Sequence, residues 1–247
     1  MTGEALDTGP GALGRLRAVA LRTAPGAAPV AVPGAEVLGG AGLAGDIHAD
    51  PLSPRQVLLA GAAAYQALRL PRHALRENLL LDADTAGLRS GMVLQLGADV
   101  LLQLMFQCEA CGSLDAHSPG LARAIGPRRG MLARVLAGGR VQAGDPVRSL
   151  GLLLPPWSDD WRERVRRVLD AAPSGMVVEY RVLARLAGIA PTYCRAFPSM
   201  LRRLGPAYAA GAVPARSARP EARWDGAGLF DLPPASAHWL PAGAAER

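Results

Sequence analysis

Apolar residues gather in short runs over the first 150 residues of this 247-residue chain, and each run ends at Gly, Asp or Pro. Runs with this length and these boundaries are typical of β-strands. They cover residues 17–22, 57–60, 91–97, 99–106 and 131–147. One helix is predicted around Ala62–Arg69. Long helices do not alternate regularly with the strands, so a doubly wound parallel sheet is not expected. The pattern predicts a mixed, largely antiparallel β domain that closes into a barrel.

The period of the pattern changes after residue 160. Apolar residues then recur at helical spacing from Trp161 to Ala172, with arginines mostly on the other face and a Ser/Asp cluster placed to cap the helix. A β-prone segment (Met176–Tyr180), a short helix (182–188) and a second helix from Pro191 to about Leu204 follow. Two short helices joined by a Gly-containing turn and followed by a β-prone tail predict an α+β winged helix-turn-helix.

A Pro-Pro pair separates the two patterns. We therefore expect a first domain over residues 1–150, a linker over 151–160, a second domain over 161–232 and a flexible Pro/Ala-rich tail over 233–247.

Composition narrows the class of protein. Half of the residues are apolar, which supports a folded core, but no apolar run reaches the length of about 18 residues that a membrane span needs. The N-terminal residues lack a secretory pattern, and three cysteines are too few for a disulfide framework. We expect a cytoplasmic protein with reduced thiols and no membrane partner.

Positive charge is concentrated in the second domain. All 27 basic residues are Arg, and the formal net charge is +6. Residues 161–223 hold 12 Arg against 4 acidic residues. This local excess predicts an anionic partner for the second domain.

A glycine-rich segment, Gly40–Gly45, fits the G-x-G-x-x-G pattern of dinucleotide-binding folds. That fingerprint needs a helix directly after the glycines, and Pro51 and Pro54 prevent one here. The segment is interpreted as a loop between strands. Its glycines beside Asp46 and His48 would let backbone amides approach an anionic ligand, with Arg55 nearby.

Cys108 and Cys111 form a C-x-x-C pair after an apolar strand. A zinc site would need two further ligands, and only Cys194 and scattered histidines remain. A thioredoxin-like pair would open a helix, which the following residues do not predict. The pair is therefore either buried and inert, or it includes a nucleophilic or metal-binding thiolate.

Six motifs in order resemble the MOSC domain, the module at the C-terminus of molybdenum cofactor sulfurases. They span roughly residues 14–148 and comprise GLAGDIH (42–48), PRQVLL (54–59), LRENLLLD (75–82), GMVLQLG (91–97), CEACGSL (108–114) and RRGMLARVLAGGRVQAGDPV (128–147). The resemblance implies a β-barrel-like fold whose signature cysteine, three residues before a Leu, binds molybdenum or carries sulfur as a persulfide. Here that cysteine is Cys111, with Leu114 as its marker.

The resemblance also implies a binding site for the molybdenum cofactor. Its pterin phosphate would be held at the positions that match the motifs, which are Gly45, Asp46, His48, Arg55 and Asn78. Members of the family either reduce N-hydroxylated bases and amidoximes, with a separate electron donor, or carry sulfur. The chain has no pyridoxal-phosphate sulfurase domain, so sulfur would come from another protein.

The second domain resembles the DNA-binding domain of O6-alkylguanine-DNA alkyltransferases and alkyltransferase-like proteins. Its PSGMVVEYRVLA segment (173–184) fits the family pattern, and Arg195-Ala196 match the pair that enters the space of a flipped base. Pro198 replaces an expected Gly. The resemblance implies contacts with double-stranded DNA by Tyr180, Arg195, Arg202 and Arg203.

The alkyl-accepting cysteine of that family is absent, since Ala215 stands in its place and Arg216 replaces the following histidine. Without a thiolate and its base no alkyl transfer is expected. Two functions remain open: a molybdenum-cofactor-binding oxidoreductase or sulfur carrier that uses Cys111 on a small-molecule substrate, or a non-enzymatic sensor of DNA lesions with the barrel as scaffold. A partner-docking role for the second domain is a further alternative.

Overall fold

The structure is a computed structural model and describes residues 9–233. Within these residues the chain forms two compact units. The first holds residues 9–51 and 55–157, and the second holds 52–54 and 158–233. Most of the tail expected to be flexible, residues 234–247, lies outside the described residues.

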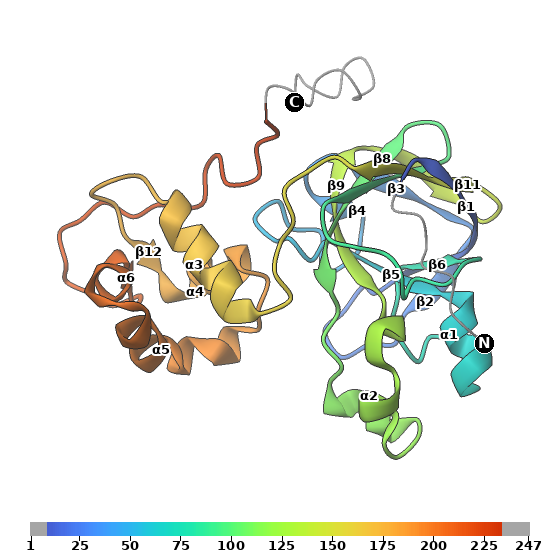
Figure 1. The fold of residues 1–247 in the computed structure, drawn as a ribbon, viewed down its shortest axis with the longest axis horizontal. Coiled ribbons are helices and arrows are strands. Elements are labelled where there is room, and N and C mark those ends of the chain that lie inside the picture. The colour runs from blue at the N-terminus through green and yellow to red at the C-terminus, as the bar shows by residue number, and fades with distance from the viewer. Residues whose placement is uncertain (1–8, 234–247) are drawn as a thin grey trace. The chain divides into compact units, whose positions relative to one another are not determined.

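Seven strands close into a barrel in the first unit (Figure 1). Their order around the barrel is β1, β11, β7, β8, β9, β5 and β6, and β1 pairs with both β11 and β6. The strands are β1 (Gly11–Leu21), β5 (Val57–Gly61), β6 (Leu79–Leu81), β7 (Met92–Leu96), β8 (Val100–Gln107), β9 (Met131–Ala137) and β11 (Pro146–Leu152). The mixed, barrel-like fold expected from the sequence is confirmed for this unit.

Shorter strands extend the barrel. β2 (Val30–Val32) pairs with the end of β1. A separate three-stranded sheet contains β10 (Gly139–Gln142), β3 (Gly34–Leu38) and β4 (Gly42–Leu43). The apolar pattern does not predict β2, β3 or β6, and β2 and β6 are only three residues long.

The barrel interior is filled by alternate residues of its strands. Successive side chains of a strand point to opposite faces, so every second residue reaches the core. The resulting cluster includes Leu16, Leu59, Leu79, Leu94, Leu102, Leu104, Val135 and Val147, all 1% exposed or less. Each such side chain contributes about 1.5–3 kcal/mol through burial of apolar surface.

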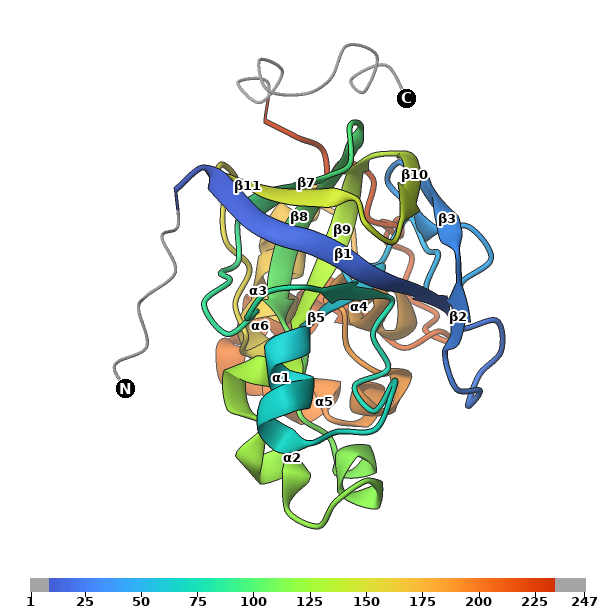
Figure 2. The same ribbon diagram turned by 90° about the vertical axis from the view of Figure 1, so that its right-hand side faces the viewer.

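Helix α1 (Ala62–Leu68) connects β5 to β6, which run parallel. Parallel neighbours need a crossover connection, because a hairpin cannot join them. The helix lies outside the barrel wall, and Figures 1 and 2 both place it beside β5 and β6. It ends where Arg69 adopts a left-handed conformation with φ of 50°. The helix predicted over residues 62–69 is thus confirmed.

A second apolar cluster anchors the segment that follows β8. Here η1 (Gly112–Ala116), α2 (Leu121–Ala124) and η2 (Gly126–Arg129) form short helical turns. Leu114, Leu121 and Ile125 from this segment pack with Ala64 of α1 and with Leu75. The loop that carries Cys108 and Cys111 is therefore fixed at both ends by buried side chains.

The second unit begins with α3 (Trp161–Ala171). The Asp160 side chain accepts a hydrogen bond from the Arg162 N–H at 2.9 Å, as expected for an N-cap. Arg164 is 1% exposed, and its guanidinium donates to the carbonyl groups of Ser158, Asp159 and Ala187. This arginine joins the start of α3 to the end of α4 (Tyr180–Leu186), so its role is structural.

The helices after α3 differ from the prediction. α4 (Tyr180–Leu186) forms where a helix was expected over 182–188. The single helix expected from Pro191 to Leu204 is wrong, since it breaks into η3 (Pro191–Arg195) and α5 (Phe197–Leu204). Pro198, in the first turn of α5, cannot donate a backbone hydrogen bond, so it begins a new helix and does not continue the old one.

The remaining elements do not make a wing. α6 (Pro206–Gly211) leads into β13 (Ala212–Val213), which pairs in parallel with β12 (Val178–Glu179). Among residues 158–233 no β-hairpin follows the helices, and only an isolated bridge joins Val177 to Arg223. The winged helix-turn-helix expected from the sequence is therefore not shown. None of the helices formed by residues 9–233 is long and apolar enough to cross a membrane.

Candidate functional site

The side chain of Asp46 lies at the centre of a hydrogen-bond network in the barrel unit and is fully buried. Its Oδ1 accepts from the backbone N–H and from Nδ1 of His48, both at 2.9 Å. Its Oδ2 accepts from the Arg22 N–H and from Asn78 Nδ2, both at 2.8 Å. Burial alone would raise the pKa of this carboxyl, but the hydrogen bonds from His48 and Arg22 outweigh it and hold the pKa below its usual value.

The same network orients Arg22. Its Nη2 hydrogen-bonds the ring of His48 at Nε2. If Nδ1 carries the proton donated to Asp46, Nε2 is the acceptor for the guanidinium. Burial and the neighbouring charge of Arg76 lower the pKa of Arg22. Asp46 thus holds an arginine in place through His48.

Asn78 links three parts of the barrel. Its Oδ1 accepts from the Leu58 N–H at 3.0 Å, and its Nδ2 donates to the Ala20 carbonyl as well as to Asp46. Gly45, directly before Asp46, adopts φ of 79° and allows the turn. The structure brings these predicted residues together, and the hydrogen bonds of Asp46 and Asn78 are made within the protein. The Gly40–Gly45 segment, expected to be a loop, contains strand β4 (Gly42–Leu43), and no helix follows it in residues 46–56.

Four arginines form a cluster of positive charge beside this network. Arg22 interacts electrostatically with Arg76 and Arg55, and Cys108 interacts with Arg55 and Arg129. We call Arg22, Arg55, Arg76 and Arg129 the arginine cluster. Like charges gathered on partly buried side chains repel each other, so an anion bound among them would be stabilised.

Arg129 is the most buried member of the cluster, at 5% exposed. Its Nη1 donates to the Leu75 carbonyl at 2.9 Å, but its buried Nε has no hydrogen-bond partner. The following residue, Gly130, adopts φ of 99°, and a Cβ there would overlap the backbone oxygen of Leu59. This close approach between β5 and the start of β9 fixes the position of Arg129. The Gly130 carbonyl also accepts from the Cys108 N–H at 2.9 Å.

The two cysteines of the C-x-x-C pair differ in exposure. Cys108 is buried and Cys111 is exposed. Burial raises the pKa of the Cys108 thiol, although Arg129 and Arg55 act in the opposite direction. Cys111 precedes η1 as its N-cap residue and interacts electrostatically with Cys108. The buried thiol of Cys108 therefore lies beside Arg129 and Arg55, and the exposed thiol of Cys111 lies three residues further along the same loop.

Sequence reasoning missed three of the four arginines. It found Arg55, but Arg22, Arg76 and Arg129 were not named as site residues. Arg76 and Arg129 lie within two of the quoted motifs, LRENLLLD and RRGMLARV, which was a usable signal. Arg22 follows β1 directly, and only the fold places it near the others.

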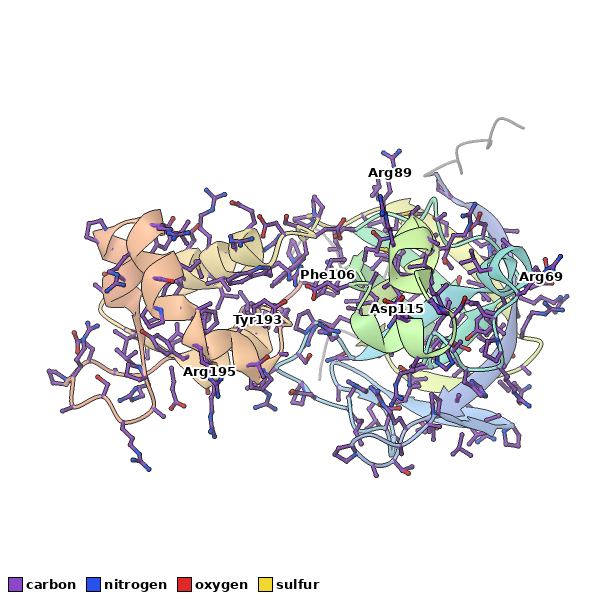
Figure 3. The ribbon with its side chains drawn as sticks, turned by 90° about the horizontal axis from the view of Figure 1, so that it is seen from below. Arg69, Arg89, Phe106, Asp115, Tyr193 and Arg195 are labelled. Atoms are coloured by element: carbon purple, nitrogen blue, oxygen red, sulfur yellow. The ribbon has the colours of Figure 1, made fainter. Side chains whose placement is uncertain are left out.

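The residues predicted to contact DNA lie in the second unit. Arg195, Arg202 and Arg203 are exposed, and Arg195 points away from the helices in Figure 3. Tyr180 is only half-buried but packs edge-on against Phe197, with 5.5 Å between ring centroids. Burial raises the pKa of Tyr180, and the positive charge of Arg202 offsets only part of that rise.

The structure describes Ala215, which the sequence resemblance matches to the alkyl-accepting cysteine. Ala215 occupies an exposed turn after β13. Cys194 lies at the end of η3, where its thiol donates to the Tyr180 carbonyl at 3.4 Å and burial raises its pKa. A thiol with these contacts is a poor nucleophile.

The barrel site fits the chemistry of a cofactor that carries phosphate and a soft metal. Arg129 Nε is a buried donor without a partner, the arginine cluster supplies positive charge, and Cys111 supplies an exposed thiol. Arginine pairs well with phosphate oxygens, and thiolate is a soft ligand. In residues 9–233 no group of three His, Cys, Asp or Glu side chains comes together to hold a metal ion.

Comparison with solved structures gives likenesses of low identity. The YuaD protein from Bacillus subtilis is 16% identical, with 57% of this chain and 96% of that chain covered and a TM-score of 0.49. YiiM from Geobacillus stearothermophilus is 17% identical (59% and 79% covered, TM-score 0.42). YiiM from Escherichia coli is 19% identical (76% and 92% covered, TM-score 0.40). No curated protein matches the chain.

The family comparison concerns the barrel unit. Residues 52–148 match the MOSC domain. All of these residues belong to the barrel unit except 52–54, which belong to the second unit. The likeness of the second unit to alkyltransferase-like proteins stays a prediction from its motifs. The match covers less than half of the chain, and over residues 52–148 the chain is similar to MOSC-domain proteins.

Proposed function

We propose that the barrel unit binds the molybdenum cofactor, or carries sulfur as a persulfide, with Cys111 as the functional thiol. The observation that carries the proposal is the arginine cluster beside Cys108, in which Arg129 Nε is buried without a partner, together with the exposed Cys111 thiol in the same loop. Asp46 and His48 take a supporting part, because their hydrogen bonds orient Arg22.

The arginine cluster would hold the phosphate of the cofactor. Guanidinium groups in a partly buried site bind phosphate through charge-assisted hydrogen bonds, which are about twice as strong as neutral ones. Arg129 gains the partner that its Nε lacks, and repulsion between Arg22 and Arg76 is relieved. The cluster therefore favours a phosphate-bearing ligand over a neutral one.

Cys111 would supply a thiolate to the metal, or that thiolate would attack the outer sulfur of a donor protein's persulfide and release the donor's thiolate. When bound, the cofactor would supply a molybdenum centre able to exchange electrons and oxygen with a small N-hydroxylated substrate. Cys108 is buried and its pKa is raised, so the two thiols have different roles. Electrons or sulfur would come from a separate protein.

The test is the molybdenum, pterin and cyanide-labile sulfur content of protein purified from cells supplied with molybdate. We expect Cys111→Ser to lose whichever of these the wild type holds, while Cys108→Ser keeps it. If the wild type holds none of them, or if Cys111→Ser keeps them, the proposal is wrong.

We also propose DNA as a ligand of the second unit. The observation in favour is the exposure of Arg195, Arg202 and Arg203 on the consecutive elements η3 and α5.

Fluorescence anisotropy with unmodified duplexes and with duplexes that contain O6-methylguanine tests the proposed DNA binding. Binding through phosphates must weaken steeply with salt. Arg202→Gln with Arg203→Gln should weaken it further, whereas binding that is equally weak at all salt concentrations contradicts it.

A further inference from the structure

A cavity of about 290 Å³ lies outside the barrel wall, between α1 and strands β1 and β6. None of the arginine cluster and neither cysteine of the C-x-x-C pair lines it. Its walls come from β1, from α1 and from the loop that returns to β6, because the β5–α1–β6 crossover carries the chain over this face. The residues that matter are Arg17, Tyr65, Arg72, His73, Glu77 and Leu80.

Glu77 is the acidic group of the cavity, and its side chain is 3% exposed. Its Oε2 accepts from the Tyr65 hydroxyl at 2.6 Å, and Tyr65 in turn accepts from the Leu75 N–H at 3.2 Å. Burial and the negative charge of Glu77 raise the pKa of Tyr65, so this phenol stays a donor. The other oxygen, Oε1, lies 3.6 Å from His73 Nδ1, which is too far for a hydrogen bond.

His73 is held beside this carboxylate in a strained conformation. Its φ is 59°, and Arg69 and Arg76 in the same loop also have positive φ. Non-glycine residues rarely adopt this conformation, and strain of this kind gathers at ligand sites. The buried Nδ1 atom of His73 has no hydrogen-bond partner. A polar group of a ligand could hydrogen-bond both His73 Nδ1 and the neighbouring oxygen of Glu77, which would satisfy the unpaired nitrogen.

The rest of the cavity has charged side chains at its rim and apolar side chains on its wall. Arg17 and Arg72 are exposed and carry positive charge at its rim. Ala18, Leu70 and Leu80 supply apolar wall. A ligand that fits would carry a hydrogen-bond donor at its inner end, an anionic group at the rim and an apolar body.

We propose that this cavity binds a small apolar α-amino acid. Its ammonium group donates to Glu77 Oε1 and to His73 Nδ1. Its carboxylate pairs with Arg72, because Arg17 already lies 3.8 Å from Asp82 Oδ1. Its side chain packs against Leu70 and Leu80.

Calorimetric titration of the full chain with leucine tests the ligand class. The matched probes are 4-methylpentanoic acid, which lacks the ammonium group, and 3-methylbutylamine, which lacks the carboxylate. A hydrogen bond to a charged group is worth about 1.5–3 kcal/mol, so removing the ammonium should weaken binding roughly tenfold or more. Absence of leucine binding at millimolar concentration, or equal binding of all three compounds, would overturn the proposal.

Two exposed arginines of the same loop provide a matched pair of variants. Arg72 lines the cavity, whereas Arg69 does not and points outward in Figure 3. We expect Arg72→Gln to weaken leucine binding about fivefold, the effect of one exposed ion pair, and Arg69→Gln to leave it unchanged. Equal effects of the two variants contradict the site. Glu77→Gln should abolish binding, and if that variant does not fold, the arginine pair still decides.

Discussion

His48 Nδ1 lies 2.9 Å from Asp46 Oδ1, and the other ring nitrogen of His48 hydrogen-bonds Arg22. A buried carboxylate therefore sets the orientation of a histidine, which sets the orientation of an arginine in the anion site. The arrangement makes Asp46 a positioning residue, whose loss affects both the stability of the barrel and the geometry of the site.

Asp46→Asn is expected to lower the free energy of unfolding by about 2 kcal/mol at neutral pH, because charge-assisted hydrogen bonds from Arg22, His48 and Asn78 are weakened. The pKa of Asp46 is depressed in the folded state. Its contribution is therefore present above the unfolded-state pKa of about 4 and is lost as pH falls through the lower, folded-state pKa.

Urea unfolding of the wild type and of Asp46→Asn at pH 7 and at several values below pH 4 measures this. The difference between the two proteins should shrink on acidification. A difference that stays constant or grows would show that the carboxylate is not the stabilising species.

Gly130→Ala should destabilise the barrel by about 3 kcal/mol, because the added Cβ meets the backbone of Leu59 and the backbone conformation suits glycine. Gly126→Ala is the matched control. Gly126 also has positive φ, but a Cβ there has open space, so only the conformational cost of about 1–2 kcal/mol remains. Thermal or urea unfolding compares them, and equal losses would contradict the close packing of β9 on β5.

The sequence predicts the barrel unit better than the second unit. Most of its longer strands are short apolar runs that end at Gly, Asp or Pro, and its ordered motifs resemble those of a known family. Inclusion of Arg22 and Arg129 in the site depends on interactions between residues 21 to 86 positions apart, which periodicity does not encode. In the second unit, Pro198 breaks a helix whose apolar spacing continues on both sides.

Cys111 should react with iodoacetamide before Cys108 and Cys194. It is exposed, while burial raises the pKa of the other two thiols and leaves less thiolate to react. Peptide mass spectrometry after brief alkylation at neutral pH gives the order. In denaturant all three should react alike, and preferential modification of Cys108 in the native protein would contradict the assignment of roles.

Asp160→Ala should destabilise the second unit by about 1 kcal/mol through loss of the N-cap of α3. Asp160→Asn keeps a capping oxygen and should cost much less. Circular dichroism melting of the two variants makes the comparison, and an equal loss in both would mean that charge, not the cap, matters at this position.

X-ray absorption at the molybdenum edge of loaded protein tests the central claim most directly. We expect one more sulfur neighbour of molybdenum in the wild type and in Cys108→Ser than in Cys111→Ser, or no bound molybdenum at all in Cys111→Ser. An identical sulfur shell in wild type and Cys111→Ser would contradict the assignment of Cys111 as the molybdenum ligand.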